Sequence, residues 1–223
     1  MQDGSSSSHQ TSSTLSRKAS ALLPSRIKPS NFIKISRIGG AITGAFLVDR
    51  EMNIPDKALG NNLFLYSGSG VGSIEADVFC VPKSAPAATA QDKTRKIAIK
   101  ICIVSGRILL NLYRPQTDEE SYPIRLYMNG AKNSRSTLSL PRSFKGPVEL
   151  CSTGNDVILS QDVQANFTLF VEENGIIEGF IGDFDHNQWT TIDQWSGDYL
   201  YWTPTTNTKN TSTLVITYND EKL

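Results

Sequence analysis

The chain has 223 residues and carries 22 Lys and Arg residues against 22 Asp and Glu residues, so its formal net charge at pH 7 is zero. Without a net positive charge the protein does not attract phosphate backbones or anionic headgroups, and we expect neither nucleic acid nor a membrane as a partner. No apolar run reaches the roughly 20 residues of a membrane-spanning helix, and no apolar signal stretch follows Met1, which together favour an intracellular, cytoplasmic location.

The N-terminal segment, residues 1–30, is rich in Ser and Thr. Its few apolar side chains cannot bury enough area to offset the entropy lost on ordering, so we predict a disordered tail. The remainder, residues 31–223, is long enough for one well-buried core and is predicted to form a single domain.

From residue 31 onward apolar and polar side chains alternate, which is the period of half-buried β-strands rather than of helices. The alternation is clearest from Ile97 to Ile103, where the isoleucines share one face and Lys100 and Cys102 lie on the other. The isoleucine face is therefore predicted to point into a core. The turn Val104-Ser105-Gly106-Arg107 predicts a hairpin between this strand and the alternating run that follows.

Other short alternating runs are separated by turn-forming residues, and no stretch of 12 or more residues has the periodicity of a helix. These further strands are predicted at Leu63 to Tyr66, Ile74 to Val81, Ile108 to Leu112, Ile124 to Met128, Leu138 to Leu140, Val148 to Cys151, Val157 to Leu159, Phe167 to Val171 and Leu214 to Tyr218.

A weak repeat runs through the middle of the chain, in which a turn precedes an alternating apolar run at residues 105–110, 134–138, 153–158 and 174–177. Once the acidic loop 115–121 is left out, the spacing is about 20 residues, which is typical of stacked supersecondary units. One such unit cannot bury its apolar face alone. We therefore predict an all-β fold in which many short strands stack in two layers, as a β-sandwich or a short β-solenoid.

Residues that build reactive or metal sites are sparse. The three cysteines, Cys80, Cys102 and Cys151, are widely spaced inside strand-like segments and are predicted to be reduced core residues. His186 is the only histidine outside the tail, and no Gly-x-Ser-x-Gly, phosphate-loop or Cys-x-x-Cys motif occurs. We therefore predict no catalytic residue, no metal site and no cofactor.

The segment 182–202 concentrates acids and indoles and supplies most of the candidate site residues. They are Asp183, Asp185, His186, Trp189, Trp195 and Asp198. Three functions compete there: sugar or small-ligand binding on the indole rings, Ca²⁺ binding by carboxylates, and glycoside hydrolysis by paired carboxylates. In the structural alternative, which we favour, the indoles close one end of the strand stack and the aspartates make turns.

A second candidate surface lies at Leu140-Pro141-Arg142-Ser143-Phe144-Lys145-Gly146-Pro147-Val148. Its two prolines bracket a loop or bulge between strands, because proline removes a ladder donor. Arg142 and Phe144 form either a protruding basic and aromatic contact point or a turn in which Phe144 fills the core. Packing is the more frequent role of a lone aromatic residue.

The same segment, with Ile181-Gly182-Asp183-Phe184, Trp195-Ser196-Gly197-Asp198 and Tyr218-Asn219-Asp220-Glu221, resembles a fungal family that is described only as a domain of unknown function. The similarity extends over roughly residues 38–221. It implies no catalytic residue, because none is assigned in that family. The repeated Ser-Gly-x-Ile turn is also similar to that of bacterial putative-adhesin domains built as β-solenoids, although residues 134–136 are Ser-Arg-Ser instead.

Because no nucleophile and base pair is visible and the predicted turn surface is extensive, we expect a non-catalytic interaction or scaffold module with protein partners. The first alternative is a carbohydrate- or small-ligand-binding module that uses segment 182–202, with a glycan as partner. The second alternative is a hydrolase that uses paired Asp residues from the same segment.

Overall fold

The computed structural model describes residues 26–52, 60–68, 72–83, 95–114, 121–131, 133–151, 156–184, 195–204 and 212–221. Within these ranges every regular element is a β-strand except one short helix, α3 (Gln161–Ala165). The predicted all-β fold with two stacked layers is confirmed. Most of the predicted tail lies outside the described residues, and Ser30 already donates a backbone hydrogen bond to Leu47 at 2.9 Å.

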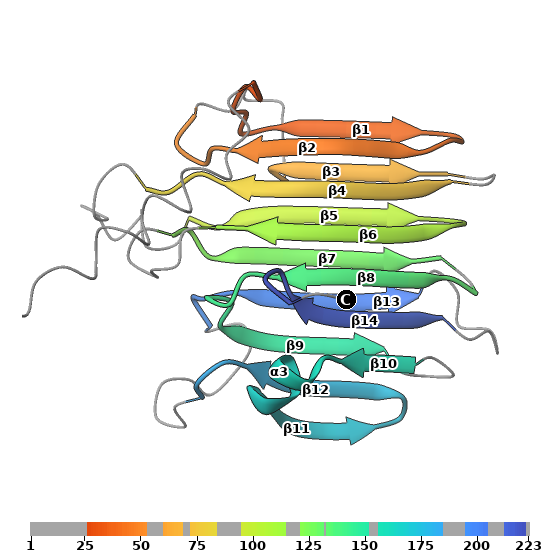
Figure 1. Cartoon of the computed structure of the whole chain (residues 1–223), viewed down its shortest axis with the longest axis vertical. Helices are drawn as coiled ribbons and strands as arrows, with labels where there is room; N and C mark the ends of the chain where they lie inside the picture. Colours follow the sequence, from red (N-terminus) through yellow and green to blue (C-terminus); the bar gives the residue numbers. More distant parts are fainter. Residues whose placement is uncertain are drawn as a thin grey trace, which may run out of the picture.

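Two sheets face one another across the core (Figure 1). The eight-stranded sheet contains, in spatial order, β1 (Ile33–Arg37), β3 (Leu63–Ser67), β5 (Ile97–Ile103), β7 (Ile124–Gly130), β13 (Tyr199–Pro204), β9 (Gly146–Cys151), β12 (Ile176–Ile181) and β11 (Phe167–Glu173). The six-stranded sheet contains β10 (Asp156–Leu159), β14 (Thr213–Tyr218), β8 (Arg135–Leu140), β6 (Arg107–Tyr113), β4 (Ser73–Cys80) and β2 (Ile42–Val48).

Successive strands from β1 to β10 alternate between the two sheets, so each consecutive pair forms one coil of a β-solenoid. Neighbouring coils pair through parallel ladders such as β3 with β5 and β4 with β6. This arrangement distinguishes the fold from a β-sandwich of hairpins, because parallel strands need a crossover to return to the same sheet. Here the crossover is the strand of the opposite sheet.

The predicted hairpin at residues 104–107 is wrong. Strand β5 pairs with β3 and β7, whereas β6 pairs with β4 and β8 in the other sheet. The turn is a coil corner, and Gly106 adopts a φ of 101° there. Alternation along the strands could not distinguish these possibilities, because both leave one apolar face on each strand. A hydrogen-bonded hairpin does occur between β11 and β12 at Asn174-Gly175.

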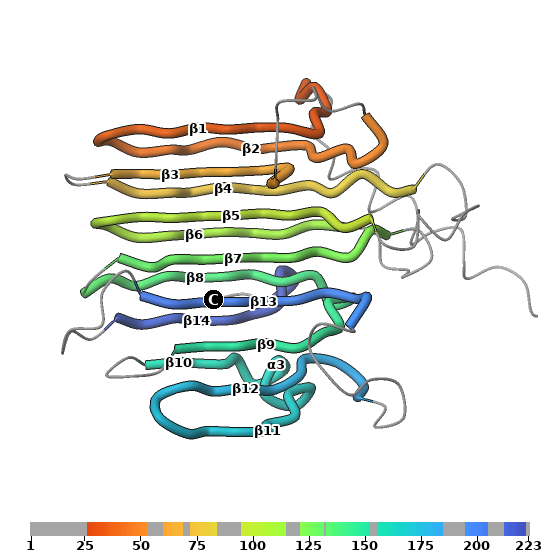
Figure 2. Tube along the Cα trace, turned by 180° about the vertical axis from the view of Figure 1, so that it is seen from behind, coloured from red at the N-terminus to blue at the C-terminus, as the bar shows by residue number. Residues whose placement is uncertain are grey.

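One coil is placed out of chain order. The coil made of β13 and β14 lies between the coil β7–β8 and the coil β9–β10, as the blue strands between green and teal show in Figure 2. After β8 the chain passes over one level of the stack and forms β9, β10, α3 and the β11–β12 hairpin. The last two strands, β13 and β14, then occupy the level that was passed over. Strand β13 is parallel to both of its neighbours, β7 and β9.

The core lies between the two sheets and is filled by inward-facing side chains from each coil. The isoleucines of β5 are at most 1% exposed, which confirms the predicted inward face of that strand. Cys80 is also buried, at 5% exposed, and belongs to the same core. Cys102 and Cys151 are half-buried at outward positions of β5 and β9, so the prediction of core cysteines is wrong for these two. Trp202, in the inserted coil, is fully buried. The six-residue register between β7 and β13 thus continues the core across the insertion.

Candidate functional site

Asp198 lies immediately before β13 and is 2% exposed. Its Oδ1 atom accepts hydrogen bonds from Arg114 Nη1 at 2.7 Å and from the Ile124 amide at 2.8 Å. Its Oδ2 atom accepts one from the Lys145 amide at 2.8 Å. Because these partners follow β6, begin β7 and precede β9, one carboxylate joins the inserted coil to the segments on either side of it.

Arg114 completes this junction. Its side chain is 3% exposed, its Nε donates to Ser143 Oγ at 2.9 Å, and its Nη2 donates to the Ser143 carbonyl. A buried ion pair is stable only when its remaining donors and acceptors are also satisfied. Asp198 is therefore engaged in holding the coils together, and neither of its oxygens is left for a substrate. Asp183, by contrast, is exposed.

Trp195 packs against the protein on two sides. Its indole Nε1 donates to the Asp198 carbonyl at 2.8 Å, and its ring meets Phe180 edge-on with centroids 5.2 Å apart. Phe184 extends this aromatic cluster, with centroids 5.2 Å from Phe180 and 4.9 Å from Phe170. The ring of Trp195 therefore supports the segment that precedes β13.

Arg142 bridges three segments on the surface. Its guanidinium contacts Asp162 at 2.6 Å and Asp220 at 2.8 Å, and lies 4.7 Å from the ring centroid of Tyr218. Phe144, at 1% exposed, belongs to the core. The alternative in which Phe144 protrudes as a contact residue is wrong, because its ring is enclosed among the inward-facing side chains.

The other three candidates, Asp185, His186 and Trp189, lie outside the described residues. In the ranges that are described, no group of three or more His, Cys, Asp or Glu side chains is arranged to hold a metal ion.

The outer face of the eight-stranded sheet carries a row of aromatic and charged side chains that the sequence analysis did not single out. We call it the central row, and in strand order from β1 to β12 it consists of Lys34, Phe64, Lys100, Tyr127, Tyr201, Glu149 and Glu178. Each member is directly opposite the next in the ladder register, so the row crosses the sheet at right angles to the strands.

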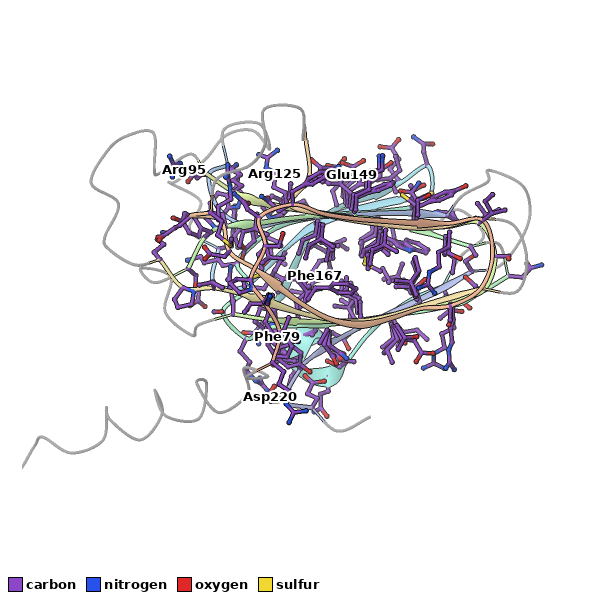
Figure 3. All side chains as sticks on the ribbon, turned by 90° about the horizontal axis from the view of Figure 1, so that it is seen from above. Phe79, Arg95, Arg125, Glu149, Phe167 and Asp220 are labelled. Atoms are coloured by element: carbon purple, nitrogen blue, oxygen red, sulfur yellow. The ribbon has the colours of Figure 1, made fainter. Side chains whose placement is uncertain are left out.

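Tyrosines occupy the middle of this face. Tyr127 lies 6.3 Å from Tyr201 and 5.9 Å from Tyr199, measured between ring centroids. The hydroxyl of Tyr199 donates to Glu149 Oε2 at 3.1 Å. Burial, followed by the nearby charge of Glu149, raises the pKa of Tyr199 above its ordinary value. Figure 3, viewed along the stack, shows Arg125 and Glu149 on the outer side of the same sheet.

Charge is segregated along the same face. The cationic residues on the outer side of the strands are Lys34 in β1, Lys100 in β5 and Arg125 in β7. The anionic residues are Glu149 in β9, Glu178 in β12 and Glu173 in β11. Glu149 and Glu178 are directly opposite each other, an arrangement of like charges that destabilises a sheet unless a cation lies nearby.

The fold is a two-sheet β-solenoid, one coil of which is inserted out of chain order, with a tyrosine-centred row on its broader sheet. A family model described as a domain of unknown function, DUF7330, matches residues 31–221, and the chain belongs to this family. No curated protein and no solved structure matches the chain. Among the described residues, no helix combines the length and apolar character needed to cross a bilayer.

Proposed function

We propose that the chain is a non-catalytic interaction module that binds a protein partner through the outer face of its eight-stranded sheet. The observation that carries this proposal is the central row, in which Tyr127 and Tyr201 lie side by side between a cationic and an anionic half. Tyrosine and arginine are enriched at the centres of protein interfaces, where aromatic rings bury large areas with few rotatable bonds.

The contacts of two polar candidate residues, Asp198 and Arg142, also support a non-catalytic function. Asp198 and Arg142 each contact several segments of the chain itself. These contacts stabilise the coil stack, so these side chains have a structural role that needs no substrate. The central row has a different character, because it stands on a rigid paired sheet and needs little ordering when a partner binds.

A capture experiment tests the proposal. The full chain, bearing a photoactivatable crosslinker, is used as bait in extracts of the source cell, and partners are quantified for the wild type, Tyr201→Ser and Tyr113→Ser. Tyr113 is the matched control, because it stacks on Phe79 at 4.7 Å on the outer face of the other sheet. We expect Tyr201→Ser to lose partners that Tyr113→Ser retains. Equal recovery with both variants would contradict the proposal.

Carbohydrate binding is the second candidate function. It is favoured by the position of Tyr201, which belongs to segment 182–202 and places its ring 6.3 Å from that of Tyr127 on the outer face of the sheet. Aromatic rings on an outer face are the groups against which a sugar ring stacks. On a glycan array, this function requires binding by the wild type and its loss in Tyr201→Ala. An array without binding, or binding that survives this substitution, would exclude it.

A further inference from the structure

We propose that the partner of the central row is a second copy of this chain, packed face to face about a two-fold axis that runs parallel to the strands between β7 and β13. This inference rests on the proposed interaction function and names the partner. The strands β7 and β13 are the fourth and fifth of the eight-stranded sheet, so the axis passes through the middle of its outer face.

A two-fold axis along the strands reverses the strand order of the second copy while keeping the strand direction. Strand β7 then faces β13 of the second copy, and β5 faces β9. In the central row, Tyr127 therefore meets Tyr201 of the second copy. Lys100 meets Glu149, and the symmetry repeats both contacts. The aromatic centre becomes buried, with ion pairs on both sides.

Two axes keep the facing strands aligned, one along the strands and one along the stack, and charge favours the first. An axis parallel to the stack would set Lys100 against Lys100 and Glu149 against Glu149, because each strand would face its own copy. Like charges placed opposite one another are destabilising, whereas opposite charges are attractive. The axis along the strands brings Lys100 of one copy to Glu149 of the other, whereas Glu178 faces Phe64, one strand away from Lys34.

A second row of outward residues, two positions further along the strands than the central row, is paired across the dimer by the same axis. Cys102 in β5 is opposite Asn129, which is opposite Thr203 in β13. The register that places Trp202 beside Leu150 brings Thr203 level with Cys151 in β9. The proposed axis therefore sets Cys102 against Cys151 of the second copy. Both cysteines are free thiols that are half-buried in one copy.

The exposed part of the face is large enough for a weak dimer. Strands lie about 4.8 Å apart and rise about 3.3 Å per residue, so eight strands of this length cover roughly 38 Å by 20 Å. The whole face is roughly 750 Å² on each copy, but Phe180 and Tyr199, in one of its three outward rows, are already buried. The exposed part is therefore about 500 Å² on each copy, which is at the small end of the range for specific interfaces.

Charge exchange provides the first test, with sedimentation velocity of the full chain as the measurement. We expect a dimer for the wild type. Lys100→Glu and Glu149→Lys should each weaken it at least about tenfold, because both symmetry-related pairs become repulsive. An equimolar mixture of these two variants should dimerise again as a heterodimer. In one pair the introduced Glu at position 100 faces the introduced Lys at position 149, and in the other the original Glu149 faces the original Lys100, so both pairs are attractive. Arg135→Glu, in the other sheet, is the control and should dimerise normally.

Thiol crosslinking provides the second test. Facing sheets lie about 10 Å apart, which is too far for a direct disulfide, so a short bismaleimide is used. We expect a crosslinked dimer from the wild type and none from Cys102→Ser or Cys151→Ser alone, since equivalent cysteines would lie about 14 Å apart sideways. A mixture of the two variants should crosslink, through Cys151 of one and Cys102 of the other. Cys80, at 5% exposed, should not react.

The results separate this inference from the function on which it rests. A monomeric wild type, or a dimer that Lys100→Glu leaves intact, overturns the second copy as partner. If a monomeric chain still captures cellular partners that Tyr201→Ser loses, the interaction function stands with a different partner. If neither dimer nor capture occurs, both proposals are wrong. Dimerisation that the charge-exchanged mixture restores supports both.

Discussion

Arg114 and Asp198 form an ion pair in which Nη1 and Oδ1 lie 2.7 Å apart and both side chains are only 3% exposed. Arg114 follows β6 and Asp198 precedes β13, so the pair links positions 84 residues apart in the chain. The same carboxylate also accepts hydrogen bonds from the backbone amides of Ile124 and Lys145. This junction fastens the coil that is inserted out of chain order to the levels on either side of it.

We expect Asp198→Asn to lower the free energy of unfolding by about 3–5 kcal/mol, because removal of one partner leaves the guanidinium of Arg114 buried without a counter-charge. Denaturant unfolding measures the loss. Arg142→Ala is the control, since its pairs with Asp162 and Asp220 are half-exposed and contribute less than about 1 kcal/mol each. A loss for Asp198→Asn no larger than for Arg142→Ala would contradict a structural role for the buried pair.

The effect should also be local. Amide hydrogen exchange in the Asp198→Asn variant is expected to rise most in β13 and β14, because this coil depends on the junction for its attachment. Strands β3 and β5, which lie two levels or more away in the stack, should keep their protection. Uniform exchange throughout the sheets would show that the junction stabilises the whole fold and not the inserted coil in particular.

Where the alternation of the sequence identified a strand, it also predicted inward and outward faces, because burial on one side imposes a period of two on a strand. Strands β1, β2 and β13 were not predicted. The alternation predicted the buried isoleucines of β5 and the outward position of Lys100. It could not predict which strands are neighbours. Tyr127 and Tyr201 are far apart in the chain and meet because β13 is inserted beside β7, which no local pattern encodes.

The same limit applies to the candidate site. An aspartate before a strand is typical of a turn, and nothing near Asp198 in the sequence reveals that Arg114 will reach it. Phe144 was a candidate contact residue, and the structure places it in the core, as the packing alternative predicted. Tyr127 lies in a predicted strand, but the strand that carries Tyr201, β13, was not predicted. The two tyrosines form one surface only through the strand order, which the sequence pattern does not give.

Gly106 at the corner between β5 and β6 should be intolerant of a side chain. Its φ is 101°, and a Cβ atom would lie 1.6 Å from the backbone oxygen of Gly72, so stacked corners would have to separate. Gly40 is the matched control, because it also has a positive φ, 87°, but nothing lies within 4 Å of its Cβ position. We expect Gly40→Ala to lower the free energy of unfolding by about 1–2 kcal/mol and Gly106→Ala by several kcal/mol more. Equal losses in denaturant unfolding would contradict close corner stacking.

Alkaline pH should destabilise the protein partly through Cys80. Burial raises the pKa of its thiol from 9.0 to about 12, with a smaller opposing effect of Arg114. The neutral thiol is thus favoured in the folded state. Its contribution to stability is complete below pH 9 and is lost as the pH rises toward 12, where the unfolded state gains by ionising.

Comparison of the wild type with Cys80→Ala isolates this contribution, since the tyrosines with raised pKa values are present in both proteins. Between pH 8 and about pH 11, the free energy of unfolding of the wild type should fall by a few kcal/mol more than that of the variant. The packing loss caused by alanine does not depend on pH and cancels in the difference. Parallel pH profiles would show that this thiol is hydrated in the folded protein.

The end of the stack at β11 should resist growth by addition of further strands, because Glu172 lies in an inward-facing row. Glu172 is opposite Ile177, which is opposite the buried Leu150, so its carboxylate continues a row that is otherwise apolar. The register shift between Leu169 and Val171 also distorts this edge. Inward-pointing charges and bulges are features that block edge-to-edge pairing of sheets.

We expect Glu172→Val to cause concentration-dependent association, measured by light scattering, because the apolar row would then reach the open edge. Glu173→Val removes the same charge from the outward face and is the control. Association that is equal in the two variants would mean that net charge, and not the inward position of Glu172, keeps this edge unpaired.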